Sequence, residues 1–299
     1  MSSLVRRVLG WPARRLLDRR IEWILAGFNY RQDRLETELR FVTEALGESL
    51  LERRLARLEP NGDLVLPIDT ARFLNWAEGP QGPAARAGLW FNPPVPVRYE
   101  PDTVEVLLVN ERIVEQPYVF AAVGALPAPA RVLDVGGSES TIALSLACLG
   151  HQVHVVDPRG YPLTHPRLSQ SVVMLHELPN ELRFDAAVAV SAIEHFGLGA
   201  YGQRSGPDER LDTDALAVIR DRLVSGGLLV LTVPCATTPA RDEFQRTYSF
   251  AQLREMLSDW DIADLSVVWQ RDRKTWIRGQ PNDPQAQSGV ALITARKPG

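Results

Sequence analysis

The stretch RVLDVGGSES, residues 131–140, decides the fold class of this 299-residue chain. Apolar residues lead into Asp134, and two glycines, Gly136 and Gly137, follow almost at once. Glycine has no Cβ, so a strand that ends in a glycine turn can bring its backbone close to a neighbouring group. We therefore expect a buried strand over 130–135, followed by a turn that approaches a ligand.

On both sides of this stretch the sequence alternates between helical and strand-like patterns. Such alternation indicates a doubly wound α/β fold, a mostly parallel sheet with helices on both faces. Gly150 is predicted to end one helix, and Ser249 with Gln252 to form a capping box at the start of another. The predicted helices span 111–126, 141–150, 211–227 and 248–259, and the predicted strands span 130–135, 151–157, 171–178, 184–191, 226–234, 261–270 and 288–297.

The position of a ligand follows from this order of elements. In a doubly wound sheet, ligands bind at the carboxyl ends of the strands, beside the first strand. Asp157 stands 21 residues beyond Gly136, at the end of the second predicted strand. A carboxylate there is placed to accept hydrogen bonds from a ribose diol. We therefore expect a nucleoside-containing cofactor. Asp134, inside the turn, suits an ammonium group better than a diphosphate.

These residues resemble a known motif. Asp134-Val135-Gly136-Gly137-Ser138, with Asp157 after the second strand, looks like the S-adenosylmethionine motif of class I methyltransferases. FDAAVAVSAIEHF (184–196) resembles their fourth motif, and LVSGGLLVLTVP (223–234) their fifth strand. The resemblance covers residues 109–299 and implies a Rossmann-like, seven-stranded sheet closed by an antiparallel strand pair. It also implies S-adenosyl-L-methionine as the cofactor, bound by Asp134, Gly136, Gly137, Ser138, Asp157 and Ser191.

The chain departs from this motif at two places. Ser138 and Ser140 stand where the family often has glycine, and MLHELP (174–179) lacks the acid or amide that often follows the third strand. The residue that contacts adenine is therefore not assigned. Glu115, just before Pro117, is expected either to contact the amino-acid end of the cofactor or to cap its own helix.

A narrower resemblance concerns the acceptor. ERIVEQPYVF (111–120), SAIEHFGLGAYG (191–202) and TVPCATTPARDEFQRTYSF (232–250) are similar to a bacterial methyltransferase group linked to surface polysaccharide and other glycan pathways. This implies O-methylation of a sugar-containing acceptor: a glycan, a glycolipid or a glycosylated natural product. Two alternatives stay open, a catalytically silent methyltransferase-like subunit that recruits a partner and the N-methylation of a small molecule.

Glu194 and His195 are the predicted catalytic residues. They follow the fourth strand directly, on the side where the methyl group should point. A hydroxyl acceptor benefits from a general base, and histidine has a suitable pKa near neutrality. His195 is the first candidate and Glu194 the second, while a purely structural His195 is the alternative. The glycine-rich loop 197–210, which contains Tyr201, is predicted to be an acceptor-binding lid.

Two segments precede this domain. Residues 1–60 combine an arginine-rich amphipathic start with apolar residues every seven positions, from Ile21 to Val42. We expect a helical arm for homo-oligomerisation, with attachment to a membrane surface or closure over the site as alternatives. Residues 61–108 are rich in Pro and Gly and are predicted to be an irregular connector that packs onto the main domain.

Composition limits the remaining choices. A net charge of −4 argues against a nucleic-acid partner. The two cysteines, Cys148 and Cys235, lie in apolar runs and are expected to be buried thiols. No cysteine or histidine spacing is typical of a metal site, so no catalytic metal is expected. No apolar run is long enough to span a membrane, and a cytoplasmic protein, peripheral at most to the inner membrane face, is expected.

Overall fold

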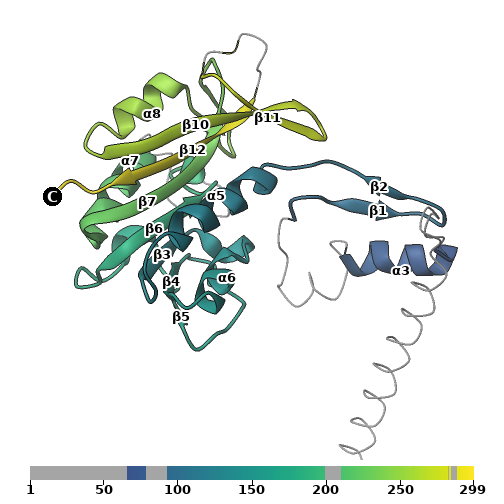
Figure 1. The fold of residues 1–299 in the computed structure, drawn as a ribbon, viewed down its shortest axis with the longest axis horizontal. Helices are drawn as coiled ribbons and strands as arrows, with labels where there is room; N and C mark the ends of the chain where they lie inside the picture. Colours follow the sequence, from purple (N-terminus) through teal and green to yellow (C-terminus); the bar gives the residue numbers. More distant parts are fainter. Residues whose placement is uncertain (1–65, 79–92, 199–209, 282, 284–287) are drawn as a thin grey trace, which may run out of the picture. The chain divides into compact units, whose positions relative to one another are not determined.

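The computed structural model describes residues 66–78, 93–198, 210–281, 283 and 288–299. The predicted arm over 1–60 and most of the predicted lid, including Tyr201, lie outside these residues. Over the described residues the largest element is an eight-stranded sheet in the order β11-β10-β12-β7-β6-β3-β4-β5 (Figure 1).

The elements of this part of the chain are as follows. The strands are β3 (Arg131–Val135), β4 (Gln152–Val156), β5 (Leu168–Ser171), β6 (Phe184–Val190), β7 (Leu223–Cys235), β10 (Asp261–Asp272), β11 (Thr275–Gly279) and β12 (Gly289–Arg296). The α-helices are α5 (Arg112–Gly124), α6 (Ile142–Cys148), α7 (Leu211–Arg222) and α8 (Phe250–Met256). Short 3₁₀ turns are η1 (Gly137–Glu139), η2 (Leu175–Glu177) and η3 (Ile193–His195), and a small hairpin pairs β8 (Ala240–Arg241) with β9 (Arg246–Thr247).

The strand directions confirm the predicted fold class. β5, β4, β3, β6 and β7 are parallel neighbours, whereas β12 is antiparallel to both β7 and β10. This is the Rossmann-like sheet with an antiparallel strand pair that the sequence predicts. The predicted count of seven strands is wrong, because β10 turns back at residues 273–274 and pairs with an additional strand, β11.

Alternate residues of each central strand pack on opposite faces of the sheet. Ala186 and Val188 of β6 pack with α5 and α6, and Ala187 and Ala189 pack with α7 and α8. Because a strand has a side-chain period of two, this alternation indicates a sheet covered on both sides. Figure 1 shows the helices against the sheet. The core therefore lies in two apolar layers that hold the strand ends in place.

Two helix ends agree with the sequence. Gly150 follows α6 with φ = 106°, a left-handed conformation that glycine adopts without strain. At α8, the Ser249 hydroxyl accepts from the Gln252 N–H, and the Gln252 side chain accepts from the Ser249 N–H.

Three local predictions are wrong. The third strand covers 168–171 rather than 171–178, because Leu175 and Leu178 point into the core from the 3₁₀ turn η2 and its C-cap. A 3₁₀ turn that seals a core with apolar residues resembles a short strand in sequence. The helix predicted to end at 227 ends at Arg222, and β7 starts at the next residue. Cys148 is exposed at the end of α6, while Cys235 is buried as expected.

The connector is not irregular throughout. It contains α3 (Ile68–Glu78) and a hairpin of β1 (Val97–Tyr99) and β2 (Val104–Val106). Asn75 joins the two, since its amide both donates to the Tyr99 carbonyl and accepts from the Tyr99 N–H, each at 2.9 Å. The predicted division at residues 60 and 108, and the packing of the connector onto the main domain, stay predictions.

Among the described strands, the order of connection reverses at β3, although β3 and its two neighbours are parallel. From β3 the chain continues to β4 and β5 on one side, and it returns to β6 and β7 on the other. The loops after β3 and β6 therefore diverge at their carboxyl ends and leave a crevice between them, where α/β sheets bind ligands. The residues after β3, β4 and β6 are Gly136, Asp157 and Ser191.

Candidate functional site

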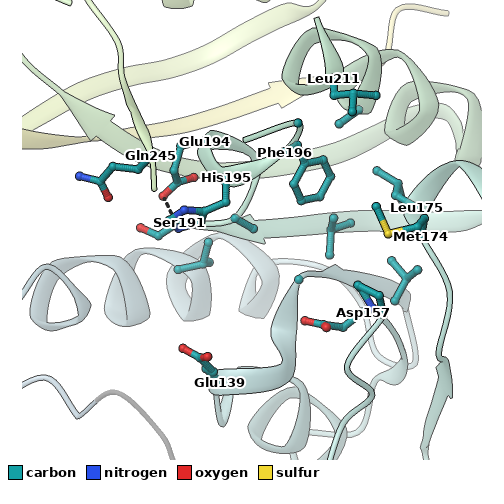
Figure 2. A pocket seen from close by; sticks show the side chains of 18 of the residues that line it. Glu139, Asp157, Met174, Leu175, Ser191, Glu194, His195, Phe196, Leu211 and Gln245 are labelled. Carbon is teal, nitrogen blue, oxygen red and sulfur yellow. Dashed lines mark ion pairs between the residues drawn. The ribbon is translucent and has the colours of Figure 1, made fainter. Parts of the chain in front are cut away.

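A cavity of about 520 Å³ lies at these strand ends. Its volume is within the range of small-molecule sites. Figure 2 shows Asp157, Met174 and Leu175 toward one end, and Ser191, Glu194 and His195 toward the other. Of the predicted site residues, the cavity is lined by Gly136, Asp157, Ser191, Glu194 and His195. Glu115, Asp134, Gly137 and Ser138 are buried behind this lining.

Gly136 lets the turn after β3 approach the loop after β6. It has φ = 72°, a conformation that favours glycine. A Cβ at this position would lie 2.8 Å from the Cβ of Ala192. The backbone of the first turn is therefore exposed to the cavity at the point where β3 and β6 separate.

Asp157 is held by its neighbours in the fold. Its carboxylate accepts hydrogen bonds from the Ser138 N–H, from the Arg159 N–H and from the Arg159 side chain through Nε and Nη2. Arg159 also pairs with Glu139 across the cavity edge. A carboxylate has about four lone-pair positions, so these four bonds use its acceptor capacity. A ribose diol can bind Asp157 only where the Arg159 side chain gives way.

Asp134 lies behind the turn on β3. It is buried, and its Oδ2 has no hydrogen-bond partner among the described residues. Burial, and secondly the charge of Asp157, raises the pKa of Asp134 to about 7. Gly137 is needed beside it, because a Cβ there would lie 2.3 Å from Oδ2. The carboxyl of Asp134 thus packs against the backbone of the turn and restricts position 137 to glycine.

Ser191 begins the loop after β6 in a strained conformation. It is a non-glycine residue with φ = 44°, a conformation that costs about 1 to 3 kcal/mol and persists only where the surroundings impose it. Its N–H donates to the Thr232 carbonyl at 3.0 Å, and its hydroxyl donates to Glu115 Oε1 at 2.7 Å. The Thr232 hydroxyl donates to the same oxygen at 2.6 Å, while Arg112 pairs with the other oxygen of Glu115. Glu115 therefore ties α5 and β7 to this loop.

Glu194 and His195 follow in the turn η3. Both oxygens of the buried Glu194 carboxyl have no hydrogen-bond partner in the described part of the chain. Burial, and then the charge of Glu115, raises the pKa of Glu194 well above its usual range. His195 Nε2 lies 3.8 Å from Glu194 Oε1 (Figure 2). Glu194 is thus held as a neutral acid. Its O–H can donate to a hydrogen-bond acceptor, and its carbonyl oxygen can face a cation.

The ring of His195 has a defined proton position. His195 Nδ1 lies 2.7 Å from the carbonyl oxygen of Phe244. A carbonyl only accepts, so Nδ1 carries the hydrogen and Nε2 is the basic nitrogen of the neutral ring. Burial lowers the pKa of His195, which keeps the ring neutral at neutral pH. This is the protonation state that a general base requires.

The other end of the cavity is apolar. Met174, Leu175, Phe196 and Leu211 line it, and Figure 2 shows their side chains grouped together. A flat aromatic base can be buried between such side chains. At MLHELP (174–179), where the acid or amide of the family motif is missing, Met174 and Leu175 therefore form an apolar wall of the cavity.

Sequence reasoning missed three arginines. Arg112 and Arg159 line the cavity, and Arg246 lies beneath η3. Arg112 and Arg159 carry a local signal, because each stands two or three residues from the acid that it pairs with, Glu115 or Asp157. Arg246 carries none, because it reaches the carbonyls of η3 across the fold. The described residues contain no group of three His, Cys, Asp or Glu side chains placed to hold a metal ion.

The comparisons with known proteins describe the fold but not the activity. A family model described as a Caenorhabditis protein of unknown function, DUF268, matches residues 172–275. No curated protein matches the chain. No helix in the described residues is long and apolar enough to cross a membrane.

Solved structures with a similar arrangement include methyltransferases. One is the Burkholderia thailandensis 1,6-didemethyltoxoflavin-N1-methyltransferase with bound 1,6-didemethyltoxoflavin and S-adenosylhomocysteine, at 21% identity and a TM-score of 0.45, over 62% of this chain and 77% of that one. Another is the N-methyltransferase NodS from Bradyrhizobium japonicum WM9 with S-adenosylhomocysteine, at 14% identity and a TM-score of 0.43, over 63% and 88%. A third is the [4+2]-cyclase SpnF, at 18% identity and a TM-score of 0.48, over 79% and 98%. Likeness at this level is too low to carry function over to this chain.

Proposed function

We propose that this chain is an S-adenosyl-L-methionine-dependent methyltransferase. The observation that carries the proposal is the cavity at the point where β3 and β6 diverge. It joins the Gly136 turn and Asp157 at one end to the basic nitrogen of His195 at the other. A nucleoside site and a general base therefore share one enclosed space, as a transfer from a nucleoside cofactor to a polar acceptor requires.

The residues around the cavity fit the parts of the cofactor. The wall of Met174 and Leu175 suits the base, and Asp157 suits the ribose diol. The neutral, unpartnered carboxyl of Glu194 can turn its carbonyl oxygen toward a nearby positive charge. The cofactor supplies an activated methyl group when it is bound. The chain's own residues then have to align the acceptor and exclude water.

We further propose O-methylation of a sugar-containing acceptor, such as a glycan, a glycolipid or a glycosylated natural product. A hydroxyl must lose its proton as it reacts, and Nε2 of His195 can accept it because Nδ1 is already protonated. The half-exposed Phe244 and Gln245 line the cavity beside His195 and offer an apolar face and an amide to a sugar. N-methylation of a small molecule is the alternative chemistry in the same cavity.

A second candidate is a catalytically silent subunit. One observation favours it: the four hydrogen bonds to Asp157 already come from Ser138 and Arg159. If Arg159 never releases Asp157, a ribose has no carboxylate to bind. The cavity would then serve the recruitment of a partner rather than catalysis.

Calorimetry with S-adenosylmethionine and S-adenosylhomocysteine separates these candidates without knowledge of the acceptor. We expect both to bind the full-length protein, and Asp157→Ala to weaken binding by about 1 to 3 kcal/mol, the scale of lost charged hydrogen bonds. Asp185→Ala is the matched control, because Asp185 pairs with Arg131 at the amino end of the sheet. Absence of binding to the unaltered protein would contradict the proposal. Binding that Asp157→Ala leaves unchanged would show that the ribose lies elsewhere.

A further inference from the structure

The turn η3 carries Glu194 and His195 but has little support of its own. It has three residues, and it follows Ser191 with its strained backbone. A 3₁₀ turn of this length has few internal hydrogen bonds. The position of His195 must therefore be held by other parts of the fold.

Arg246, the first residue of β9, supports the backbone of this turn. Its side chain is almost completely buried. Nη1 donates to the carbonyl of Phe196, and the Glu194 carbonyl lies 3.4 Å from the same nitrogen. These two carbonyls lie on either side of His195, so one guanidinium supports the backbone both before and after the base.

Arg246 is itself held by a buried acid. Its Nε lies 3.5 Å from Asp212 Oδ2, in the first turn of α7. The Tyr248 hydroxyl donates to the same oxygen at 2.9 Å. The backbone of Tyr248 bonds to Pro234 and Ala236 at the end of β7. The guanidinium is thus fixed to both a helix and a central strand.

The same segment also reaches the ring of His195. The Phe244 carbonyl accepts from Nδ1, and the Phe244 ring lies edge-on to the imidazole with centroids 4.5 Å apart. Residues 244–246 therefore contact both the ring of His195 and the backbone of the two residues that flank it. Neither Arg246 nor Asp212 lines the cavity, so both act through another residue.

We propose that Arg246 is a positioning residue for the reaction proposed above: together with Asp212 it holds η3 so that His195 presents Nε2 to the cavity. This inference rests on the proposed function only in assigning the base to His195. In geometric terms, the tautomer and the burial of His195 depend on Arg246, which lies 51 residues away in the chain.

The test is NMR of histidine side chains in the full-length protein with Arg246→Met, which removes the donors and keeps the apolar stem. We expect the pKa of His195 to rise toward its ordinary value, because burial is what lowers it. The preference for the Nδ1–H tautomer should weaken as well. The titratable groups that face His195 are Glu194, Glu139, Arg112, Arg159 and Asp242, and they remain unaltered. The His195 signal is assigned by its absence in His195→Ala.

Arg222→Met is the matched control. Arg222 is also buried and donates to a backbone carbonyl, that of Leu178, but it does not line the cavity or contact η3. It should lower thermal stability without moving the His195 signal. Arg246→Lys keeps the charge and one donor, so it should restore part of the wild-type titration and also serves if Arg246→Met does not fold.

The expected result is a shifted His195 titration with unchanged S-adenosylhomocysteine affinity and, once an acceptor is known, a kcat about 100-fold lower, the cost of a small misplacement. An unchanged titration and tautomer in Arg246→Met would overturn the inference. An equal shift in Arg222→Met would also overturn it, since general loosening would then be the cause. If the shift occurs but kcat does not change, the assignment of His195 as base fails. If the wild type does not bind S-adenosylhomocysteine, the proposed cofactor fails while the titration still tests the support of η3.

Discussion

Single residues carry the electrostatics of the cavity, and buried carboxyls dominate them. Asp134, Glu194 and Glu111 all have a raised pKa, with burial as the largest cause. Desolvation disfavours the charged form of an acid, so each of these groups is held toward neutrality. The cavity can therefore contain many acids without strong mutual repulsion.

Asp134 should make the protein less stable as the pH rises. Its pKa is about 7 in the folded state, against about 3.9 for an unfolded aspartate. Between these values the folded state binds more protons, so the stabilisation is complete below about pH 4 and is lost as the pH rises through 7. Of this shift, only the two units between pH 5 and the folded pKa of about 7 fall within the measured range. Urea unfolding at pH 5 and pH 8 should therefore show a decrease that Asp134→Asn reduces by about 3 kcal/mol.

The control for this prediction is Asp185→Asn. Arg131 lowers the pKa of Asp185, mainly through its hydrogen bond, so Asp185 is ionised at both pH values. Its replacement should leave the difference between pH 5 and pH 8 unchanged. A decrease of the same size in Asp134→Asn and in the wild type would contradict the assignment.

His195 and Glu194 can be distinguished by their protonation. His195→Ala should lose roughly 100- to 10,000-fold in kcat, the contribution of a positioned base. The acidic limb of the pH–rate profile should lie below the ordinary histidine pKa of about 6.5, because burial lowers the pKa of His195, and it should vanish in the variant. Glu194→Gln imitates the neutral acid and should keep most of the activity.

Both variants would be compared with the wild type by measuring the rate of methyl transfer from pH 5 to pH 9. If the acidic limb survives in His195→Ala, the base is Glu194 or no residue at all. A large loss in Glu194→Gln would point to an ionised Glu194 as the group that acts.

At the scale of elements, the turns after β3 and β4 form one unit. The Ser138 N–H of η1 donates to Asp157, and Arg159 after β4 pairs with Glu139 of η1. The two turns are therefore ordered together, and Arg159 occupies the acceptor positions that a ribose would use.

Arg159→Met should tighten the binding of S-adenosylhomocysteine. It removes the two side-chain bonds to Asp157 while the Arg159 N–H still donates. One hydrogen bond is worth about 1 kcal/mol net, so we expect an affinity roughly fivefold higher by calorimetry. Arg131→Met, which breaks a similar pair with Asp185 at the other end of the sheet, is the control. Weaker binding in Arg159→Met would show that the guanidinium itself contacts the ligand.

At the scale of the whole molecule, residues 66–299 form one compact unit that contains the cavity. The open question is what residues 1–60 add to this unit. Their arginine-rich start and seven-residue apolar spacing predict homo-oligomerisation, with contact with an anionic membrane surface or closure over the site as alternatives.

A truncated protein that starts at Asn61 should lose assembly and keep its affinity for S-adenosylhomocysteine. The reason is that every described residue that lines the cavity comes after position 110. Sedimentation velocity of the two proteins would measure the particle mass. An identical mass before and after truncation would reject oligomerisation through this segment, and flotation with anionic vesicles would then test membrane contact.

Local pattern in the sequence was sufficient to predict the α/β class and the position of the cavity. Alternation of apolar residues indicates strands because their side-chain period is two, and chain order then places Gly136, Asp157 and Ser191 at neighbouring strand ends. Local pattern also predicted the Ser249 capping box, which involves residues three apart. It failed at β5, where a core-sealing turn has the composition of a strand, and at β11, a strand of only five residues.

Only the tertiary structure decided how the side chains of the site are held. Glu115 meets Ser191 and Thr232, which are 76 and 117 residues away. Arg246 supports a turn that lies about 50 residues earlier in the chain. Such contacts depend on which rotamer each side chain adopts once helices pack on the sheet, and no short segment contains that information. The sequence by itself therefore determined which strand ends the cavity lies at, whereas the proton on Nδ1 of His195, set by the Phe244 carbonyl 49 residues away, required packing across the domain.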